Sequence, residues 1–168
     1  MRLNLREIIE IPGGQVPFSC ELDTDGLDFP AVAAYITKPR AEGRIYNEAG
    51  VLRMKGEITA RLRCICDRCG DEFESVKTTG IDATIVEEDP GDNPELFLLD
   101  GDEADLDEIV YTCFVLDMES KFLCKEDCKG LCPTCGKNLN LGPCACRKQL
   151  DPRFAVLEQL LDKDPDGE

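Results

Sequence analysis

The sequence of 168 residues contains no histidine, although it contains eleven cysteines. Histidine is the usual general acid or base of an enzyme near neutral pH, and its imidazole is a common metal ligand. The absence of histidine therefore argues against ordinary side-chain acid–base catalysis, and we expect a protein that is not an enzyme. Any metal site in this chain must be built from thiolates or carboxylates.

The chain also lacks a long apolar run. Its first residues, MRLNLREIIEIPGG, carry charges throughout the stretch that a secretory signal peptide keeps apolar. No segment approaches the roughly 20 apolar residues that span a bilayer. We therefore expect a cytoplasmic protein with no membrane contact, whose cysteines stay reduced.

Basic residues are missing from one segment. Between Glu87 and Glu108 there are eleven acidic residues and no lysine or arginine. Because the whole chain carries a net charge of −16, this segment contributes −11 and the remainder −5. Pro90, Gly91, Pro94 and Gly101 oppose regular packing, so residues 87–105 are predicted to be an acidic loop. Within it, Leu96 to Leu99 predict either a short docked strand or a mobile loop.

Strand-favouring residues dominate the first half of the chain. The first 23 residues alternate loosely around Pro12-Gly13-Gly14, which predicts two strands in a hairpin. Further strands are predicted for residues 43–46, for residues 51–63 with a break at Gly56, and for residues 73–86. The predicted fold is mainly β with α (α+β), with residues 1–86 forming a small antiparallel sheet that curls toward a barrel.

Helical spacing returns after the acidic loop. Leu106, Ile109, Val110, Cys113 and Leu116 predict an amphipathic helix that ends near Ser120. A short terminal helix is predicted from Asp151 as N-cap, with Phe154, Leu157, Leu160 and Leu161 on one face. Residues 106–168 would then comprise this middle helix, a cysteine-rich zinc segment and the terminal helix, packed on the core.

Two cysteine pairs have the spacing of zinc knuckles. They are Cys66-Asp67-Arg68-Cys69-Gly70 and Cys132-Pro133-Thr134-Cys135-Gly136. Two residues between the thiols let a tight turn direct both sulfurs at one ion. The following glycine accepts the positive φ that turns backbone amides toward the thiolates. Two such pairs in one cytosolic chain indicate bound zinc.

Eight cysteines are available for one or two tetrahedral zinc ions. Locality groups Cys132 and Cys135 with Cys144 and Cys146, which leaves Cys66 and Cys69 to join Cys124 and Cys128 and clamp the tail to the sheet. Cross-pairing of the knuckles is equally allowed by tetrahedral geometry, and Cys64 has the spacing to replace Cys66. All-thiolate sites without an open position are typical of structural zinc, whose binding is folding energy.

Two other cysteine chemistries compete with structural zinc. A redox role for the CxxC pairs is disfavoured because thioredoxin-type motifs precede a helix in a βαβ unit that this sequence lacks. Cys128, Cys132 and Cys135 have the C-x3-C-x2-C spacing with which radical S-adenosylmethionine enzymes hold an iron–sulfur cluster. The chain lacks the length and the alternating βα pattern of the barrel in those enzymes.

The cysteine pattern resembles a known family. The chain is similar to the longer members of the YceD family of bacteria and plastids in three successive features. These are CDRC after a strand, an acidic connection, and then CKEDCKGLCPTCGKNLNLGPCACRKQLDPR. The resemblance covers about residues 40–161. It implies an accessory role in the synthesis, processing or accumulation of 23S ribosomal RNA, with no defined catalytic activity. It also implies that Cys66 and Cys69 are the family's strand-end pair and that the six cysteines from Cys124 to Cys146 are its C-terminal cluster. Cys20, Cys64 and Cys113 match nothing in the family, and we expect them to be small buried hydrophobic residues.

Two basic patches suggest contact with RNA. Odd-numbered residues of one strand share a face, so Arg53, Lys55, Arg61 and Arg63 are predicted to lie together. With Arg68 in the neighbouring loop, they form a basic ridge. The tail adds Lys129, Lys137, Arg147 and Lys148 beside Asn138 and Asn140. Ordinary solvated faces explain both patches equally well.

The acidic segment suggests a different partner. Residues 87–108 could bind basic ribosomal proteins or RNA-binding proteins, although a solubilising loop is the commoner role of such a segment. Our first hypothesis is an assembly factor that acts through protein partners. The second is direct binding of ribosomal RNA through the basic ridge. No small-molecule substrate is predicted.

Overall fold

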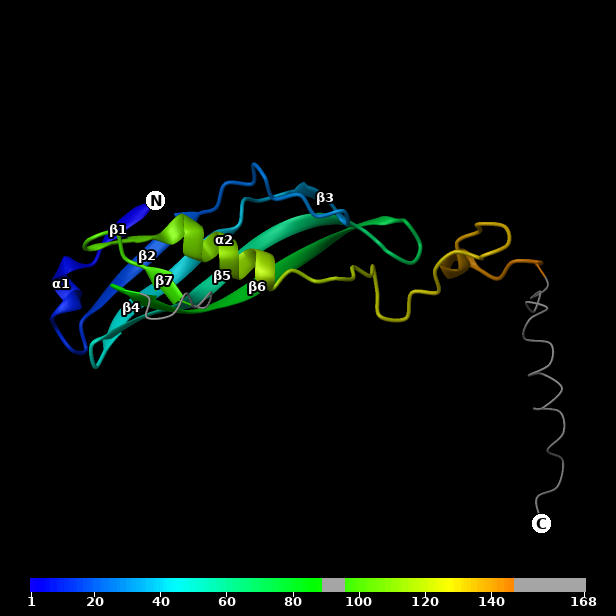
Figure 1. Ribbon diagram of the computed structural model, residues 1–168. Helices are drawn as coiled ribbons and strands as arrows, with labels where there is room; N and C mark the ends of the chain where they lie inside the picture. Colours follow the sequence, from blue (N-terminus) through cyan, green and yellow to red (C-terminus); the bar gives the residue numbers. More distant parts are fainter. Residues whose placement is uncertain (89–95, 147–168) are drawn as a thin grey trace, which may run out of the picture. The chain divides into compact units, whose positions relative to one another are not determined.

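The computed structural model describes residues 1–88 and 96–146. The chain divides into two compact units, Met1–Cys128 and Lys129–Glu168, of which the second is described as far as Cys146 (Figure 1). Arg147, Lys148 and the predicted terminal helix lie outside the described residues. No described helix is long and apolar enough to cross a membrane.

One six-stranded sheet dominates the described part of the first unit. Its strands run in the order β2-β4-β5-β6-β7, with β3 paired to β5, and only the β6–β7 pair is parallel. The sheet is open, because the order ends at β2 and β7, so the predicted curl does not close into a barrel among these residues. The α+β class is confirmed. The strand bounds are β2 Gln15–Glu21, β3 Val32–Tyr35, β4 Arg40–Glu48, β5 Val51–Ile65, β6 Glu72–Val86 and β7 Leu96–Leu98.

The two long strands follow the period-two pattern of a sheet with one buried face. Even-numbered residues of β5 such as Leu52, Ile58 and Leu62 lie in the core, and the odd-numbered residues from Lys55 on are exposed. The predicted break at Gly56 is wrong, because β5 pairs without interruption with both β4 and β6. Gly56 pairs with Gly43, and a Cβ atom on Gly56 would lie 2.3 Å from the Glu42 carbonyl oxygen. Close approach of two backbones therefore explains this glycine.

The predicted N-terminal hairpin is wrong. β1 (Arg2–Asn4) pairs with β8 (Glu103–Asp105), the four-residue helix α1 (Arg6–Ile9) follows, and β2 pairs with β4. The buried side chain of Asn47 donates hydrogen bonds to the carbonyls of Ile8 and Ile9, at 2.8 and 2.6 Å. These bonds hold the end of α1 against β4, where a hairpin partner was expected.

The helix α2 (Leu106–Leu116) packs on the buried face of the sheet (Figure 1). Its carboxylate N-cap, Asp105, accepts hydrogen bonds from the amides of Asp107 and Glu108. The helix ends before the predicted Ser120. Leu116, predicted on the apolar face, is 80% exposed, and Phe114 is buried instead. β7 and β8 both form within the segment predicted as an acidic loop.

Candidate metal centres

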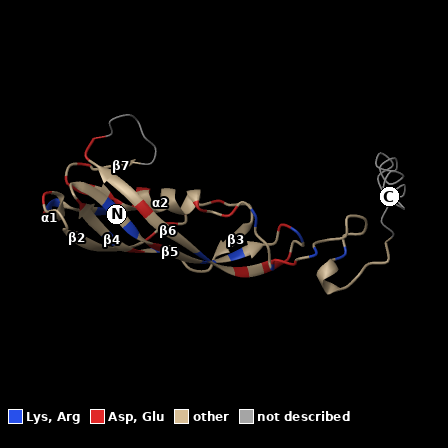
Figure 2. Ribbon diagram, turned by 90° about the horizontal axis from the view of Figure 1, so that it is seen from below, with Lys and Arg blue, Asp and Glu red and all other residues tan. Residues whose placement is uncertain are grey.

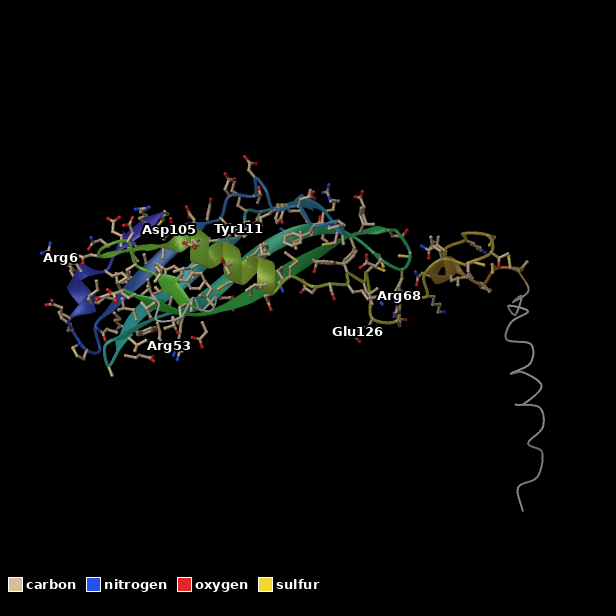
Figure 3. All side chains as sticks on the ribbon, in the orientation of Figure 1. Arg6, Arg53, Arg68, Asp105, Tyr111 and Glu126 are labelled. Carbon is tan, nitrogen blue, oxygen red and sulfur yellow. The ribbon has the colours of Figure 1, made fainter. Side chains whose placement is uncertain are left out.

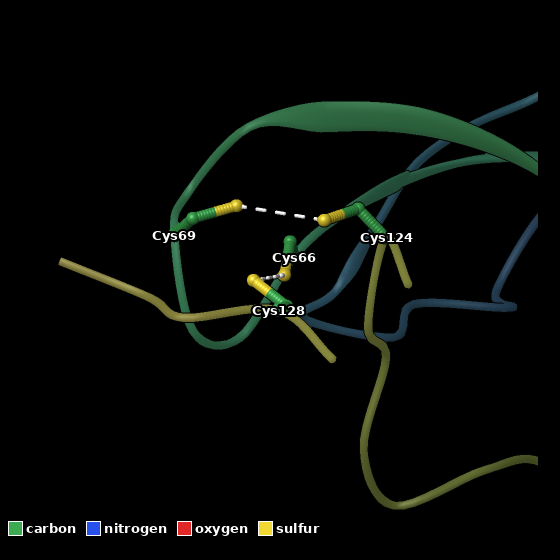
Figure 4. A group of neighbouring side chains, drawn as sticks. All are labelled: Cys66, Cys69, Cys124 and Cys128. Atoms are coloured by element: carbon green, nitrogen blue, oxygen red, sulfur yellow. Dashed lines mark hydrogen bonds between the residues drawn. The ribbon is translucent and has the colours of Figure 1, made fainter. Parts of the chain in front are cut away.

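The first cysteine group gathers at the loop between β5 and β6. Cys66 and Cys69 come from this loop, and Cys124 and Cys128 come from the segment after α2 (Figure 4). The four sulfurs lie within 4.8 Å of one another, with Sγ–Sγ distances of 3.7 Å for Cys66–Cys128 and for Cys69–Cys124. Cys66, Cys69 and Cys128 are buried, and they form a small cluster with Phe73 and Leu123 at its edge.

Local backbone structure positions the first pair of thiols. The amide of Gly70 donates to the Cys66 carbonyl at 2.8 Å, which closes the turn, and Gly70 has a φ of 72°. A left-handed residue is required there, and glycine adopts that conformation without steric cost. The knuckle geometry predicted from the CxxCG sequence is therefore present.

The two residues between Cys66 and Cys69 form hydrogen bonds with the segment that carries Cys124 and Cys128. The Asp67 carboxylate accepts from the Phe122 amide at 2.6 Å, while the Asp67 amide donates to the Phe122 carbonyl at 2.9 Å. The Arg68 guanidinium donates to the Cys128 carbonyl at 2.9 Å. The segment that carries Cys124 and Cys128 is thus bound to the β5–β6 loop on both sides of the thiols.

The first group fits a tetrahedral metal ion. A Zn–S bond of about 2.3 Å separates the four sulfurs of a tetrahedron by about 3.8 Å, close to the two distances of 3.7 Å. Burial opposes ionisation of Cys66, but the amides of Cys124, Cys69 and Arg68 outweigh it and lower the pKa of this thiol to about 6. Burial and the neighbouring thiols raise the pKa of Cys124. The group therefore forms one thiolate readily, and a cation is needed to ionise all four.

The second cysteine group lies within the second unit. The sulfurs of Cys132, Cys135, Cys144 and Cys146 lie within 4.8 Å of one another, and the Cys132–Cys144 distance is 3.4 Å. Gly136 has a φ of 69° and donates to the Cys132 carbonyl at 2.9 Å, which repeats the first knuckle. The amides of Cys135 and Thr134 lower the pKa of the Cys132 thiol to about 6. Cys135 is exposed, unlike any cysteine of the first group.

Polar residues of the tail stabilise the second group's loop. The Asn138 side chain caps the short 3-10 helix η1 (Leu139–Leu141) by accepting from the Asn140 amide, and Asn140 accepts from the Lys129 amide. The Lys137 ammonium donates to the Pro143 carbonyl at 2.8 Å. Lys137 and the two asparagines, considered above for RNA contact, therefore already take part in the loop's own hydrogen bonds.

The observed grouping separates the residues of the radical-enzyme motif. Cys128 lies with Cys66, Cys69 and Cys124, whereas Cys132 and Cys135 lie with Cys144 and Cys146. Of the two arrangements that the spacing allowed, the structure has the local one. Cys64 does not replace Cys66, because it is fully buried in the main core. Cys20 is also buried there, as predicted, whereas Cys113 is only partly buried against that core. Burial raises the pKa of Cys20, Cys64 and Cys113 above the usual value for a thiol.

The predicted basic ridge carries paired charges. Its strand residues share the outer face of β5, as predicted, but Arg53 pairs with Asp82 at 2.6 Å and Arg61 with Glu74 at 3.0 Å. Lys55 pairs with Glu48 at 3.2 Å. Basic and acidic residues lie on the same strands of this sheet (Figure 2). Arg63 is exposed beside Glu74 in the strand register, and Arg68 lies at the first cysteine group, away from Arg53 (Figure 3).

The residues that sequence reasoning missed are those that support the first group. Asp67 has no predicted role inside its knuckle, and Arg68 is predicted to contact RNA. Lys77 was also missed, although a lysine among the inward-facing, odd-numbered positions of β6 is an unusual residue to bury. Its ammonium donates to the Asp117 carbonyl at 2.5 Å and to the carboxylates of Asp117 and Glu119. These contacts fix the chain between α2 and Cys124.

The fold and the two cysteine groups define an α+β protein with two four-thiol centres able to hold metal ions. The sequence profile of the family described as "Large ribosomal RNA subunit accumulation protein YceD" matches residues 54–161. The chain belongs to the YceD family. The family's description refers to accumulation of the large ribosomal RNA subunit.

Proteins similar to the chain include mycobacterial ones. Uncharacterized proteins of Mycobacterium tuberculosis (strain ATCC 25618 / H37Rv) and of Mycobacterium bovis (strain ATCC BAA-935 / AF2122/97) are each 36% identical to it over 62 residues. The match covers 37% of this chain and 30% of each relative. No solved structure matches the chain.

Proposed function

We propose that this protein is a non-enzymatic accessory factor for the synthesis, processing or accumulation of 23S ribosomal RNA, and hence for biogenesis of the large ribosomal subunit. The family match over residues 54–161 carries the proposal. The absence of histidine from the sequence agrees with a role that needs no acid–base catalysis.

Zinc in the two four-thiol centres is part of the proposal. The ligands would be Cys66, Cys69, Cys124 and Cys128 in one centre and Cys132, Cys135, Cys144 and Cys146 in the other. Four sulfurs around one ion leave no open coordination position, so the chemistry supplied is folding energy. The first centre would hold the segment after α2 on the β5–β6 loop, in support of the contacts of Asp67 and Arg68.

Protein partners are favoured over direct RNA contact. Phosphate binding gains free energy when cationic side chains displace counterions, but Arg53, Lys55 and Arg61 already have carboxylate partners. The acidic chain matches a basic ribosomal or RNA-binding protein instead. Replacing Arg61 and Arg63 by glutamate should therefore leave retention on ribosomal RNA unchanged. Complete loss of retention, measured by gel shift at fixed salt, would favour the RNA-binding alternative.

The accessory role is tested by deleting the gene in the source organism. We expect a lower ratio of large-subunit to small-subunit ribosomal RNA. The wild-type gene should restore it, and a variant with Cys66 and Cys69 replaced by serine should not. An unchanged ratio after deletion would contradict the proposed function.

A further inference from the structure

Within the described part of the chain, one edge of the sheet has no paired strand over most of its length. β7 pairs with β6 only at Thr84, Ile85 and Val86. Among the described residues, no strand pairs with the same side of β6 between Glu74 and Asp82. We call this stretch, residues 74–82, the β6 edge.

The backbone of the β6 edge is oriented for strand addition. The Val86 carbonyl accepts from the Leu99 amide, so Val86 directs its backbone groups away from β5. β6 pairs with β5 without a register shift, and backbone directions alternate along a regular strand. Asp82, Gly80, Thr78 and Val76 therefore also direct their N–H and C=O groups to the free side. An extended peptide could form the hydrogen bonds of a further strand there.

No contact among the described residues explains Gly80, in the middle of the β6 edge. A Cβ atom on Gly80 would meet none of their atoms within 4 Å, and its φ is not in the left-handed region. Glycine inside a strand costs about 0.5–1 kcal/mol relative to alanine. A strand glycine without an internal reason is typical of a place where another chain approaches closely.

A carboxylate lies behind this glycine. Glu57 on β5 is directly opposite Gly80 in the register and is exposed. Among residues 1–88 and 96–146, no lysine or arginine forms an ion pair with Glu57. A strand added to the β6 edge would lie two strand spacings, about 10 Å, from β5. Because Gly80 has no side chain, a long cationic side chain placed opposite it could extend over β6 and reach the Glu57 carboxylate.

A cavity of mixed polarity lies at one end of the β6 edge. It measures about 370 Å³, and the apolar residues Leu96, Phe97 and Leu116 line it together with the paired Arg53 and Asp82. Leu116 is 80% exposed, which is unusual for a leucine at the end of a helix that otherwise packs in the core. An apolar side chain of an added strand would have a place to bind there.

The opposite end of the sheet lacks these features. β2, the other terminal strand, contains Pro17, and proline on an edge strand opposes strand addition. β6 contains no proline from Glu72 to Val86. Edge-to-edge pairing of two copies would bring together two chains that each carry a net charge of −16. The surface therefore suits a basic partner better than itself.

We infer that the β6 edge binds an extended basic segment of a partner protein as an added strand, with a lysine or arginine opposite Gly80 paired to Glu57 and an apolar residue in the adjacent cavity. The inference rests on the proposed function only for the class of partner, a basic ribosomal or RNA-binding protein.

The probe is a ten-residue peptide of alternating lysine and valine, compared with its glutamate–valine counterpart, on the full metal-loaded chain. We expect only the basic peptide to bind, with new hydrogen-exchange protection at the amides of Thr78, Gly80 and Asp82. Equal binding of the two peptides, protection elsewhere, or dimerisation of the chain through this edge would overturn the inference.

Variants separate binding from folding. Gly80→Val should weaken peptide binding by roughly fivefold while leaving the melting temperature unchanged or higher, because valine favours strands. Thr78→Pro, compared with Thr78→Val, removes an outward amide and should weaken binding at equal metal content. Glu57→Gln should weaken binding where Glu42→Gln, one strand further on, does not. Unchanged affinity in Gly80→Val and Glu57→Gln would overturn the inference.

The two proposals fail differently. Normal ribosomal RNA in the deletion strain, with peptide binding at the β6 edge intact, would remove the proposed function and leave the binding surface. Reduced ribosomal RNA without peptide binding would remove the surface and leave the accessory role.

Discussion

Lys77 is buried on the core side of β6 and holds the end of α2. Burial of the ammonium group opposes its charge, but the hydrogen bonds that it donates to Asp117 and Glu119 outweigh that cost and raise the pKa of Lys77. The cation also lies where a helix C-terminus carries its partial negative charge. The lysine therefore directs the chain from the helix toward Cys124.

Replacing Lys77 by methionine should lower the free energy of unfolding by about 1–2 kcal/mol, since a charge-assisted hydrogen bond is lost from a buried site and both acids remain half exposed. Lys77 holds the pKa of Asp117 below its ordinary value of 3.8. This contribution to stability is present above pH 3.8 and is lost as the pH falls below it. In the variant, carbon NMR titration should return the Asp117 pKa toward 3.8. No change in that pKa would contradict the contact.

Gly56 and Gly80 offer a matched comparison of two strand glycines. At Gly56 a Cβ atom would lie 2.3 Å from the Glu42 carbonyl oxygen, whereas at Gly80 it would meet nothing within 4 Å. Gly56→Ala should therefore destabilise the fold by about 1–3 kcal/mol through overpacking, and Gly80→Ala should not. Thermal unfolding of both variants checks this, and equal melting temperatures would refute the close approach of β4 and β5.

At the scale of elements, the sequence predicted those features that depend on neighbouring residues in the chain. Alternation of apolar residues located β5 and β6, and the CxxCG pattern located both turns. The N-terminal hairpin failed because β1 finds its partner, β8, about 100 residues away, and no local pattern records such a pairing. The break at Gly56 failed for the same reason, because the opposing Gly43 becomes visible only in the register. The burial of Lys77 depends on acids 40 residues further along.

The first cysteine group depends on residues that are not ligands. Asp67→Ala removes the acceptor of the Phe122 amide, and outer contacts of this kind typically change metal affinity by about 10–100-fold. In competition with a chelator, the Asp67→Ala variant should release the ion of the first centre more easily than the wild type does. The affinity of the second centre should be unchanged. Glu126→Ala is the control, because Glu126 is exposed in the same segment (Figure 3). Equal affinities for wild type and Asp67→Ala would show that this contact does not support the centre.

At the scale of the whole molecule, the sheet and the cysteine-rich segment differ in their charge. The outer face of the sheet mixes both signs in ion pairs, whereas residues 129–150 contain four basic residues and no acid. Four thiolates around a zinc ion would add −2 to that segment and reduce its positive charge. The whole chain nevertheless carries a net charge of −16, which agrees with a role exerted through basic protein partners.

The most direct test of the account is the metal content of the full chain purified without added metal. We predict two zinc ions per chain in a colourless protein, one ion after Cys69→Ser and one after Cys135→Ser, because each centre draws its ligands from one group. Iron with sulfide in a brown protein, or the loss of all metal from either single variant, would contradict two independent zinc centres.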